Sequence, residues 1–78
     1  MKIMTCKQLG GACEQEFQAN SFEEIVKISK QHGTDMFNNR DPAHLAAMDD
    51  MLQLIQILDA MTKWLESKRQ EFAALPEN

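Results

Sequence analysis

The chain has 78 residues, 44% of them hydrophobic and 26% charged, which is the composition of one small folded domain rather than of a disordered segment. Its formal net charge of −4 argues against nucleic acid or an anionic membrane as the main ligand, because both require a basic surface. All of the excess negative charge lies in residues 41–78, which carry three Lys/Arg and seven Asp/Glu.

Met1 leads directly into a strand-like run, and no apolar run approaches the roughly twenty residues that span a bilayer. We therefore expect a soluble, cytoplasmic protein without a signal peptide or membrane segment. In a reducing compartment, two cysteines are usually free thiols or metal ligands rather than a disulfide.

The first predicted element is a β-hairpin. Residues 2–6 and 13–19 alternate in character, and Gly10-Gly11 between them suits the positive φ angles of a two-residue turn. A turn centred there places Met4 opposite Phe17, and Gln8 opposite Cys13. One face, which we expect to be buried, then carries Met4, Cys6, Cys13, Phe17 and Ala19.

A helix should follow the hairpin and cover its apolar face. Ser21 and Glu24 form a capping box at its start, and Gly33, after His32, predicts its end. Residues 34–40 then read as a polar connection. The apolar stripe of this helix consists of Phe22, Ile25, Val26 and Ser29, with Ile28 beside it.

The second half predicts further helix, starting at Asp41-Pro42 as N-cap and first helical position. Two series of apolar residues meet near Leu58 with a spacing that would move the apolar stripe around the axis of a continuous helix. This favours a break there, with Asp59 capping a third helix, and one long bent helix is the alternative. Trp64 is expected in the core between these helices, and an interface role is the other interpretation. The apolar series are Leu45, Met48, Leu52 and Ile55, then Leu58, Met61, Leu65, Phe72 and Leu75.

These elements predict an α+β fold in a single domain, 1–78, with a hairpin and helix in residues 1–33 and a helical half in residues 41–75. The apolar residues suffice for one thin layer, and the hairpin keeps an unpaired edge. Because small chains commonly complete such a core by association, we expect a homo-oligomer or a protein partner.

The segment Met4-Thr5-Cys6-Lys7-Gln8-Leu9-Gly10-Gly11-Ala12-Cys13, followed by Phe17, Glu23-Glu24 and His32, resembles the small prokaryotic domain-of-unknown-function 1059 family. The resemblance covers residues 1–37, and the Cys-x-x-Leu-Gly-x-x-Cys spacing is its specific part. Many relatives carry a second His one turn later, where this chain has Met36-Phe37. The family has no assigned activity, so the resemblance implies a fold and adds no chemistry.

Cys6, Cys13 and His32 form the candidate site. Both cysteines lie near the free end of the hairpin, and the helix starts at the opposite end and runs back over the apolar face. Its eleven residues cover about 16 Å, whereas the strand from Cys13 to Ala19 covers about 20 Å. His32 should therefore arrive near the two thiols.

Three interpretations of this site compete. In the first, the thiols pack as small hydrophobic groups and His32 caps the carbonyls at the helix end. In the second, all three residues bind a soft metal such as zinc, with Asp35 or a water as fourth ligand; His44 lies too far along the chain to place, and is expected at a surface or interface. In the third, the cysteines form a redox pair or act as a reactive thiol. A turn centred on the glycines places their Cα atoms about 7–8 Å apart, so a disulfide would require the turn to shift.

No phosphate-binding loop, nucleotide fingerprint or catalytic triad order is present, so we expect neither a cofactor nor an enzyme. The favoured function is a small interaction or assembly module. The alternative is a metal-binding or thiol-sensing module that uses Cys6, Cys13 and His32.

Overall fold

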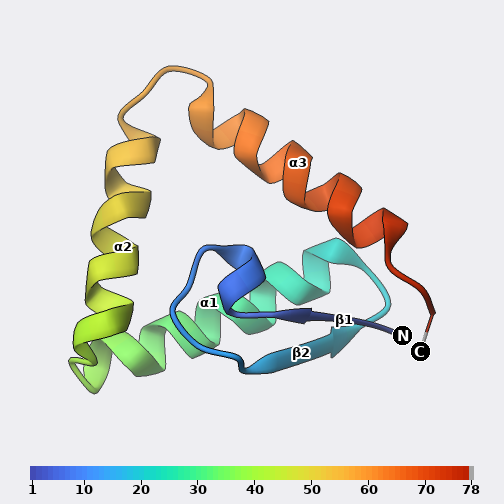
Figure 1. Ribbon diagram of the computed structural model, residues 1–78, viewed down its shortest axis with the longest axis horizontal. Coiled ribbons are helices and arrows are strands. Elements are labelled where there is room, and N and C mark those ends of the chain that lie inside the picture. Colours follow the sequence, from blue (N-terminus) through green and yellow to red (C-terminus); the bar gives the residue numbers. More distant parts are fainter. Residues whose placement is uncertain (78) are drawn as a thin grey trace.

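The computed structural model describes residues 1–77 as a two-stranded hairpin followed by three helices (Figure 1). This confirms the predicted α+β class. The elements are strand β1 (Lys2–Thr5), a 3-10 turn (Lys7–Leu9), strand β2 (Glu16–Ala19), and the helices α1 (Phe22–Asn38), α2 (Pro42–Ile55) and α3 (Ala60–Ala74).

β1 and β2 pair antiparallel, with Met4 opposite Phe17 as predicted. Helix α1 runs along the hairpin and covers its apolar face (Figure 1). Met4 and Ile25 are fully buried between the strands and the helix. Met4 points toward α1 because every second side chain of a strand points to the same face. Within residues 1–77, the buried apolar core consists of seven residues: Met4, Cys6, Phe17, Ala19, Phe22, Ile25 and Phe72.

Helix α1 starts as predicted but ends later. The Ser21 hydroxyl accepts the Glu24 N–H at 3.2 Å, which is the N-terminal half of the capping box. Gly33 does not stop the helix, so the predicted connection over residues 34–40 is mostly helical. One internal glycine costs a helix about 1 kcal/mol, a small penalty beside the packing of a seventeen-residue helix against the rest of the chain.

The chain turns from α1 into α2 at Asn39 and Arg40. Arg40 adopts a left-handed backbone (φ 54), and the Asp41 N–H donates to the Met36 carbonyl at 3.2 Å. This is the Schellman arrangement that ends many helices. Asp41 then caps α2 as predicted, accepting the N–H of His44 at 3.0 Å.

The predicted break between two helices is confirmed at residues 56–59. Asp59 occupies the N-cap position of α3 with a left-handed backbone (φ 65), but its side chain makes no capping hydrogen bond. Helix α3 returns toward the hairpin and leaves α2 and α3 as the two sides of an arch (Figure 1). Phe72 joins the core at the end of α3, and Lys2 Nζ donates to the carbonyls of Phe72 and Ala73.

The predicted apolar stripe of α2 is half-buried at Leu45 and Met48 and exposed toward the end of the helix. Leu52 and Ile55 are 56% and 55% exposed, whereas His44, Met48 and Met51 line a cavity shared with α1 and the hairpin. Among residues 1–77, none of the helices combines the length and the apolar character that crossing a bilayer requires.

Candidate metal centre

Cys6 closes β1 and begins the turn that carries the site. Its N–H donates to the Gln15 carbonyl at 2.8 Å, and its own carbonyl accepts the N–H groups of Leu9 at 3.0 Å and Gly11 at 2.8 Å. The chain therefore wraps around Cys6 over residues 7–11. This wrapping holds the thiol in the core, where Cys6 is 5% exposed.

The predicted two-residue turn at Gly10-Gly11 is wrong, although both glycines are structurally required. Gly10 has φ 85 and ends the 3-10 turn, and a Cβ at this position would lie 2.7 Å from Met51 Cε. A Cβ at Gly11 would lie 2.1 Å from Cys6 Sγ. The glycine pair thus makes room for a sulfur atom and for helix α2, instead of forming a tight hairpin.

Cys13 lies on the return path of the same loop. The Lys7 N–H donates to the Cys13 carbonyl at 2.9 Å, which keeps the two cysteine-bearing segments side by side. The Cys13 thiol is half-buried and lies 3.3 Å from Nε2 of His32. Both thiols are free.

His32 comes from the middle of α1, on the face that packs against the hairpin. Its ring meets Phe17 edge-on, with 5.5 Å between centroids. As predicted, it reaches the two thiols. The interpretation in which His32 caps a helix end is wrong, because α1 continues six residues further, to Asn38.

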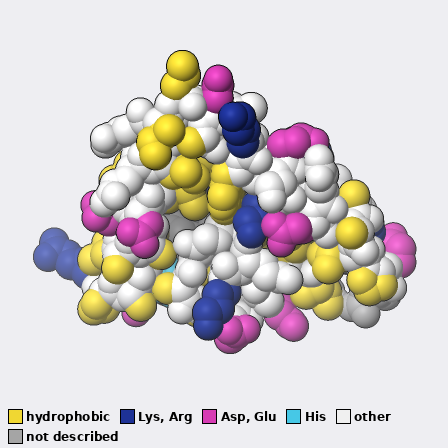
Figure 2. Space-filling view, turned by 45° about the horizontal axis from the view of Figure 1, so that its top comes forward, with side chains coloured by type: hydrophobic (Ala, Val, Ile, Leu, Met, Phe, Trp, Pro, Cys, Tyr) yellow, Lys and Arg dark blue, Asp and Glu magenta, His cyan; other side chains and the backbone are white. Residues whose placement is uncertain are grey.

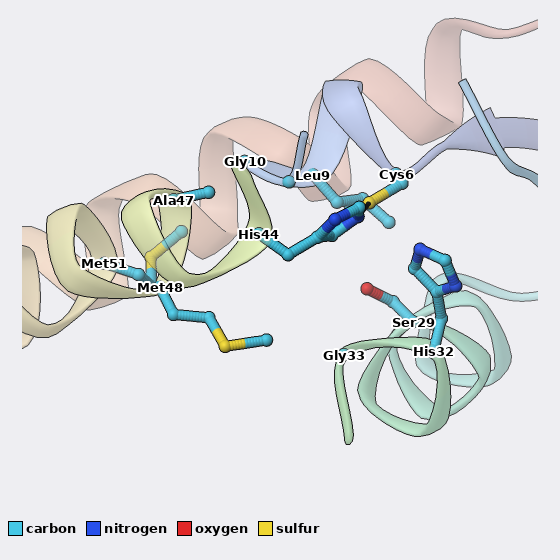
Figure 3. Close-up of a pocket in the computed structure, with 11 residues that line it drawn as sticks. Cys6, Leu9, Gly10, Ser29, His32, Gly33, His44, Ala47, Met48 and Met51 are labelled. Carbon is cyan, nitrogen blue, oxygen red and sulfur yellow. Dashed lines mark hydrogen bonds between the residues drawn. The ribbon is translucent and has the colours of Figure 1, made fainter. Parts of the chain in front are cut away.

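His44 completes the group, and the expectation that it lies at a surface or interface is wrong. It sits in the first turn of α2, is 6% exposed, and places Nε2 3.6 Å from Cys6 Sγ. The rings of His32 and His44 are in contact, with centroids 5.3 Å apart. In Figure 3 the two imidazoles point into the same space from α1 and α2, with Cys6 beside His44.

Asp41 orients the His44 ring through Nδ1, the ring nitrogen that does not face Cys6. Its Oδ2 lies 2.5 Å from His44 Nδ1 and also accepts the His44 N–H. A carboxylate at Nδ1 holds the proton on that nitrogen, so Nε2 is the atom that faces the sulfurs. The residue that caps the helix is therefore also the one that fixes the ring orientation.

Hydrogen bonding and burial set the protonation of the group. Burial raises the pKa of the Cys6 thiol. Hydrogen bonds from the N–H groups of Cys13 and Ala12 lower this pKa but do not outweigh the effect of burial. Burial also opposes ionisation of Cys13, but the Gln15 N–H and the His44 imidazole outweigh it and lower the pKa of this thiol.

Asp41 and His44 each change the pKa of the other. Its hydrogen bond raises the pKa of His44 and lowers the pKa of the Asp41 carboxyl. A metal ion that binds thiolates and neutral imidazoles displaces protons from such a group.

The four side chains converge on one point. The two Sγ atoms and one nitrogen of each imidazole all lie within 4.8 Å of one another. They come from four segments in the order Cys-x6-Cys-x18-His-x11-His. Asp35, the predicted substitute ligand, is exposed and is not one of the group.

An apolar cavity of about 140 Å³ adjoins the site. Ser29 contributes a hydroxyl group to its wall (Figure 3). Its other lining residues, apart from Cys6, His32 and His44, are Leu9, Gly10, Gly11, Gly33, Ala47, Met48 and Met51. The site therefore has a largely apolar surrounding on this side, which lowers the local dielectric and limits the access of water.

Comparisons of the chain with models of protein families, with curated proteins and with solved structures give no match. The resemblance to the domain-of-unknown-function 1059 family stays a prediction. What can be said about function therefore depends on the geometry of the four side chains.

Proposed function

We propose that this chain is a small zinc-binding module in which Cys6, Cys13, His32 and His44 hold one metal ion. The observation that carries the proposal is the convergence of their four ligand atoms within 4.8 Å. Thiolate and imidazole are the ligands of zinc, and two of each make one of its common structural sets. Hard cations such as Mg²⁺ and Ca²⁺ prefer oxygen ligands, which this group lacks.

The distances between partners suit a single ion. A tetrahedral zinc with Zn–S of about 2.3 Å and Zn–N of about 2.0 Å separates a sulfur from a nitrogen by about 3.5 Å. The two sulfur–nitrogen contacts here measure 3.6 Å, between Cys6 and His44, and 3.3 Å, between Cys13 and His32. Small shifts of the side chains would therefore admit the ion.

Simple packing of two thiols explains the group less well. It accounts for Cys6 in the core but not for two imidazoles in edge contact beside the thiols. Histidines carry a desolvation cost when buried, which a shared metal ion offsets. The hydrogen bond from His44 to Asp41 is also the arrangement that supports zinc-bound histidines.

We infer that the metal has a structural and not a catalytic role. Four protein ligands complete the tetrahedron, whereas catalytic zinc keeps one position open for water or substrate. The ion would join the hairpin loop, α1 and α2, and the apolar core of the described part of the chain has seven buried residues. Small domains commonly add a metal when their core is this limited.

Native mass spectrometry of the purified chain, before and after treatment with a strong chelator, tests the proposal. We expect one zinc per chain, and a large fall in unfolding temperature when it is removed. Cobalt substituted for zinc should give the visible absorption of a tetrahedral ion with thiolate ligands. Cys13→Ser and His44→Gln should each lose tight binding.

Ser29→Ala is the matched control because Ser29 lines the same cavity and is not one of the four ligands. It should retain one zinc per chain with wild-type affinity. A wild-type protein that binds zinc no better than a Cys6→Ser/His44→Gln double variant would refute the proposal.

A further inference from the structure

The molecule exposes more surface than a compact chain of its size. Its accessible area is 5423 Å². A folded monomer of 8.9 kDa is expected to expose about 4,800 Å². The excess of about 600 Å² approaches the roughly 800 Å² that each partner buries in a standard protein interface.

Much of the exposed apolar surface lies where α2 turns into α3. We call residues 51–58 the elbow. Leu58 is 89% exposed, and other large side chains on or near the elbow are exposed as well: Leu52, Ile55, Ile57 and Leu65. Figure 2, which turns the top of the arch toward the viewer, shows hydrophobic side chains gathered around a hollow in the upper part of this face.

An apolar groove lies next to the elbow. It measures about 220 Å³ and opens between α1 and α3. Met51 belongs to both the elbow and the groove, so the two surfaces are continuous. The remaining lining residues are Leu9, Phe22, Val26, Ser29, Lys30, Met61, Trp64 and Leu65. Trp64 thus contributes to this surface as well as to the packing of α3 against Gly10.

The charge pattern of the elbow narrows the choice of partner. Its eight residues, Met-Leu-Gln-Leu-Ile-Gln-Ile-Leu, carry no charge, although the whole chain has a net charge of −4. Across a two-fold axis, residue i of one copy meets residue j of the other and the reverse, and groups on the axis meet their own copies, so a patch of a single charge sign would repel itself. An uncharged apolar segment meets this condition, and charged residues are depleted at interface cores in general.

We propose that the elbow and its groove form the interface of a homodimer of this chain. In a two-fold arrangement, the α2–α3 arms of two copies would pack together and bury the elbows of both. Three observations support a second copy as the occupant: the excess of exposed area, the uncharged elbow and the adjoining groove. This inference goes beyond the metal proposal and does not depend on it.

Light scattering and sedimentation of the chain, purified with one equivalent of zinc, test the dimer over a range of concentrations. We expect about twice the monomer mass of 8.9 kDa. The double variant Leu52→Glu/Ile55→Glu should weaken the dimer at least about 30-fold, the effect of losing an interface hot spot. Because both side chains are exposed in one copy, the variant should keep its helix content and its zinc stoichiometry.

Phe37→Glu is the matched control, since Phe37 is 60% exposed on the far end of α1. It should leave the dimer intact. A wild-type mass of one chain at every concentration would overturn the inference, as would a Leu52→Glu/Ile55→Glu protein that remains dimeric. Binding of the wild-type elbow only to lipid vesicles, with no self-association, would also overturn it.

Discussion

The Cβ that Gly11 lacks would lie 2.1 Å from Sγ of Cys6. Backbone holds this position in place, because the Gly11 N–H donates to the Cys6 carbonyl at 2.8 Å. Any side chain at residue 11 must therefore displace either the sulfur atom or the loop. Gly11 belongs to the candidate metal centre although it offers no ligand.

Gly11→Ala should thus weaken zinc binding without removing any ligand. We expect an affinity at least about tenfold lower, comparable to the loss of a supporting contact around a metal site. Competition with a chromophoric chelator measures it. Ala12→Gly, the neighbouring change in the opposite direction, is the control and should bind zinc like the wild type. Unchanged affinity in Gly11→Ala would mean that the loop can move away from Cys6 freely.

Asp41→Asn separates the two roles of Asp41. Asparagine caps helices about as well as aspartate, so α2 should persist, but its neutral amide supports the His44 ring less strongly. We expect zinc affinity to fall by roughly 10- to 100-fold, the usual effect of removing such a partner. Helix content, from circular dichroism, should stay at the wild-type level. Equal affinities of the two proteins would show that Asp41 acts only as a cap.

Arg40→Gly should stabilise the fold. Arg40 has φ 54, a left-handed conformation that costs an L-residue about 1–2 kcal/mol and that glycine adopts freely. After the greater chain entropy of glycine is subtracted, we expect a net gain of about 0.5–1 kcal/mol in the free energy of unfolding, measured by denaturant titration. Asn39→Gly provides the contrast, since residue 39 is right-handed (φ −79) and should lose stability.

The ion pair between Glu23 and Arg69 makes a pH-dependent contribution to stability. It joins the start of α1 to α3, and the hydrogen bond from Arg69 lowers the pKa of Glu23. A carboxyl with a depressed folded pKa stabilises the fold above its unfolded pKa, and this contribution is lost as pH falls through the folded pKa. Both side chains are exposed, so the effect should be small and sensitive to salt.

Glu23→Gln should therefore unfold at a slightly lower temperature than the wild type at pH 7. The gap should begin to narrow as the pH falls below the ordinary glutamate pKa of about 4.3, and it should close below the lowered folded pKa of Glu23. Thermal unfolding of both proteins across pH gives the comparison, and any loss of metal in acid affects both alike. A gap that persists unchanged in acid would assign it to something other than the ion pair.

Local patterns predicted the elements well because their causes lie within a few residues. The capping box at Ser21, the N-cap at Asp41 and the break before Asp59 each depend on neighbouring side chains and backbone groups. The pairing of Met4 with Phe17 followed from the two-residue repeat of a strand. The length of α1 was missed, because whether a helix passes a glycine depends on the packing of the turns beyond it.

The sequence by itself determined that two thiols and His32 would meet, because a helix that starts after Ala19 and runs back over the hairpin at about 1.5 Å per residue brings residue 32 to the end where the cysteines lie. Only the tertiary structure decided that His44 joins them, because the angle between α1 and α2 depends on a left-handed Arg40 and on packing around Met48 and Met51. One local sign was present, in that His44 stands three residues after the N-cap Asp41 and so falls within its reach. Whether the first turn of α2 points toward the cysteines depends on contacts between segments far apart in the sequence, and no short pattern encodes it.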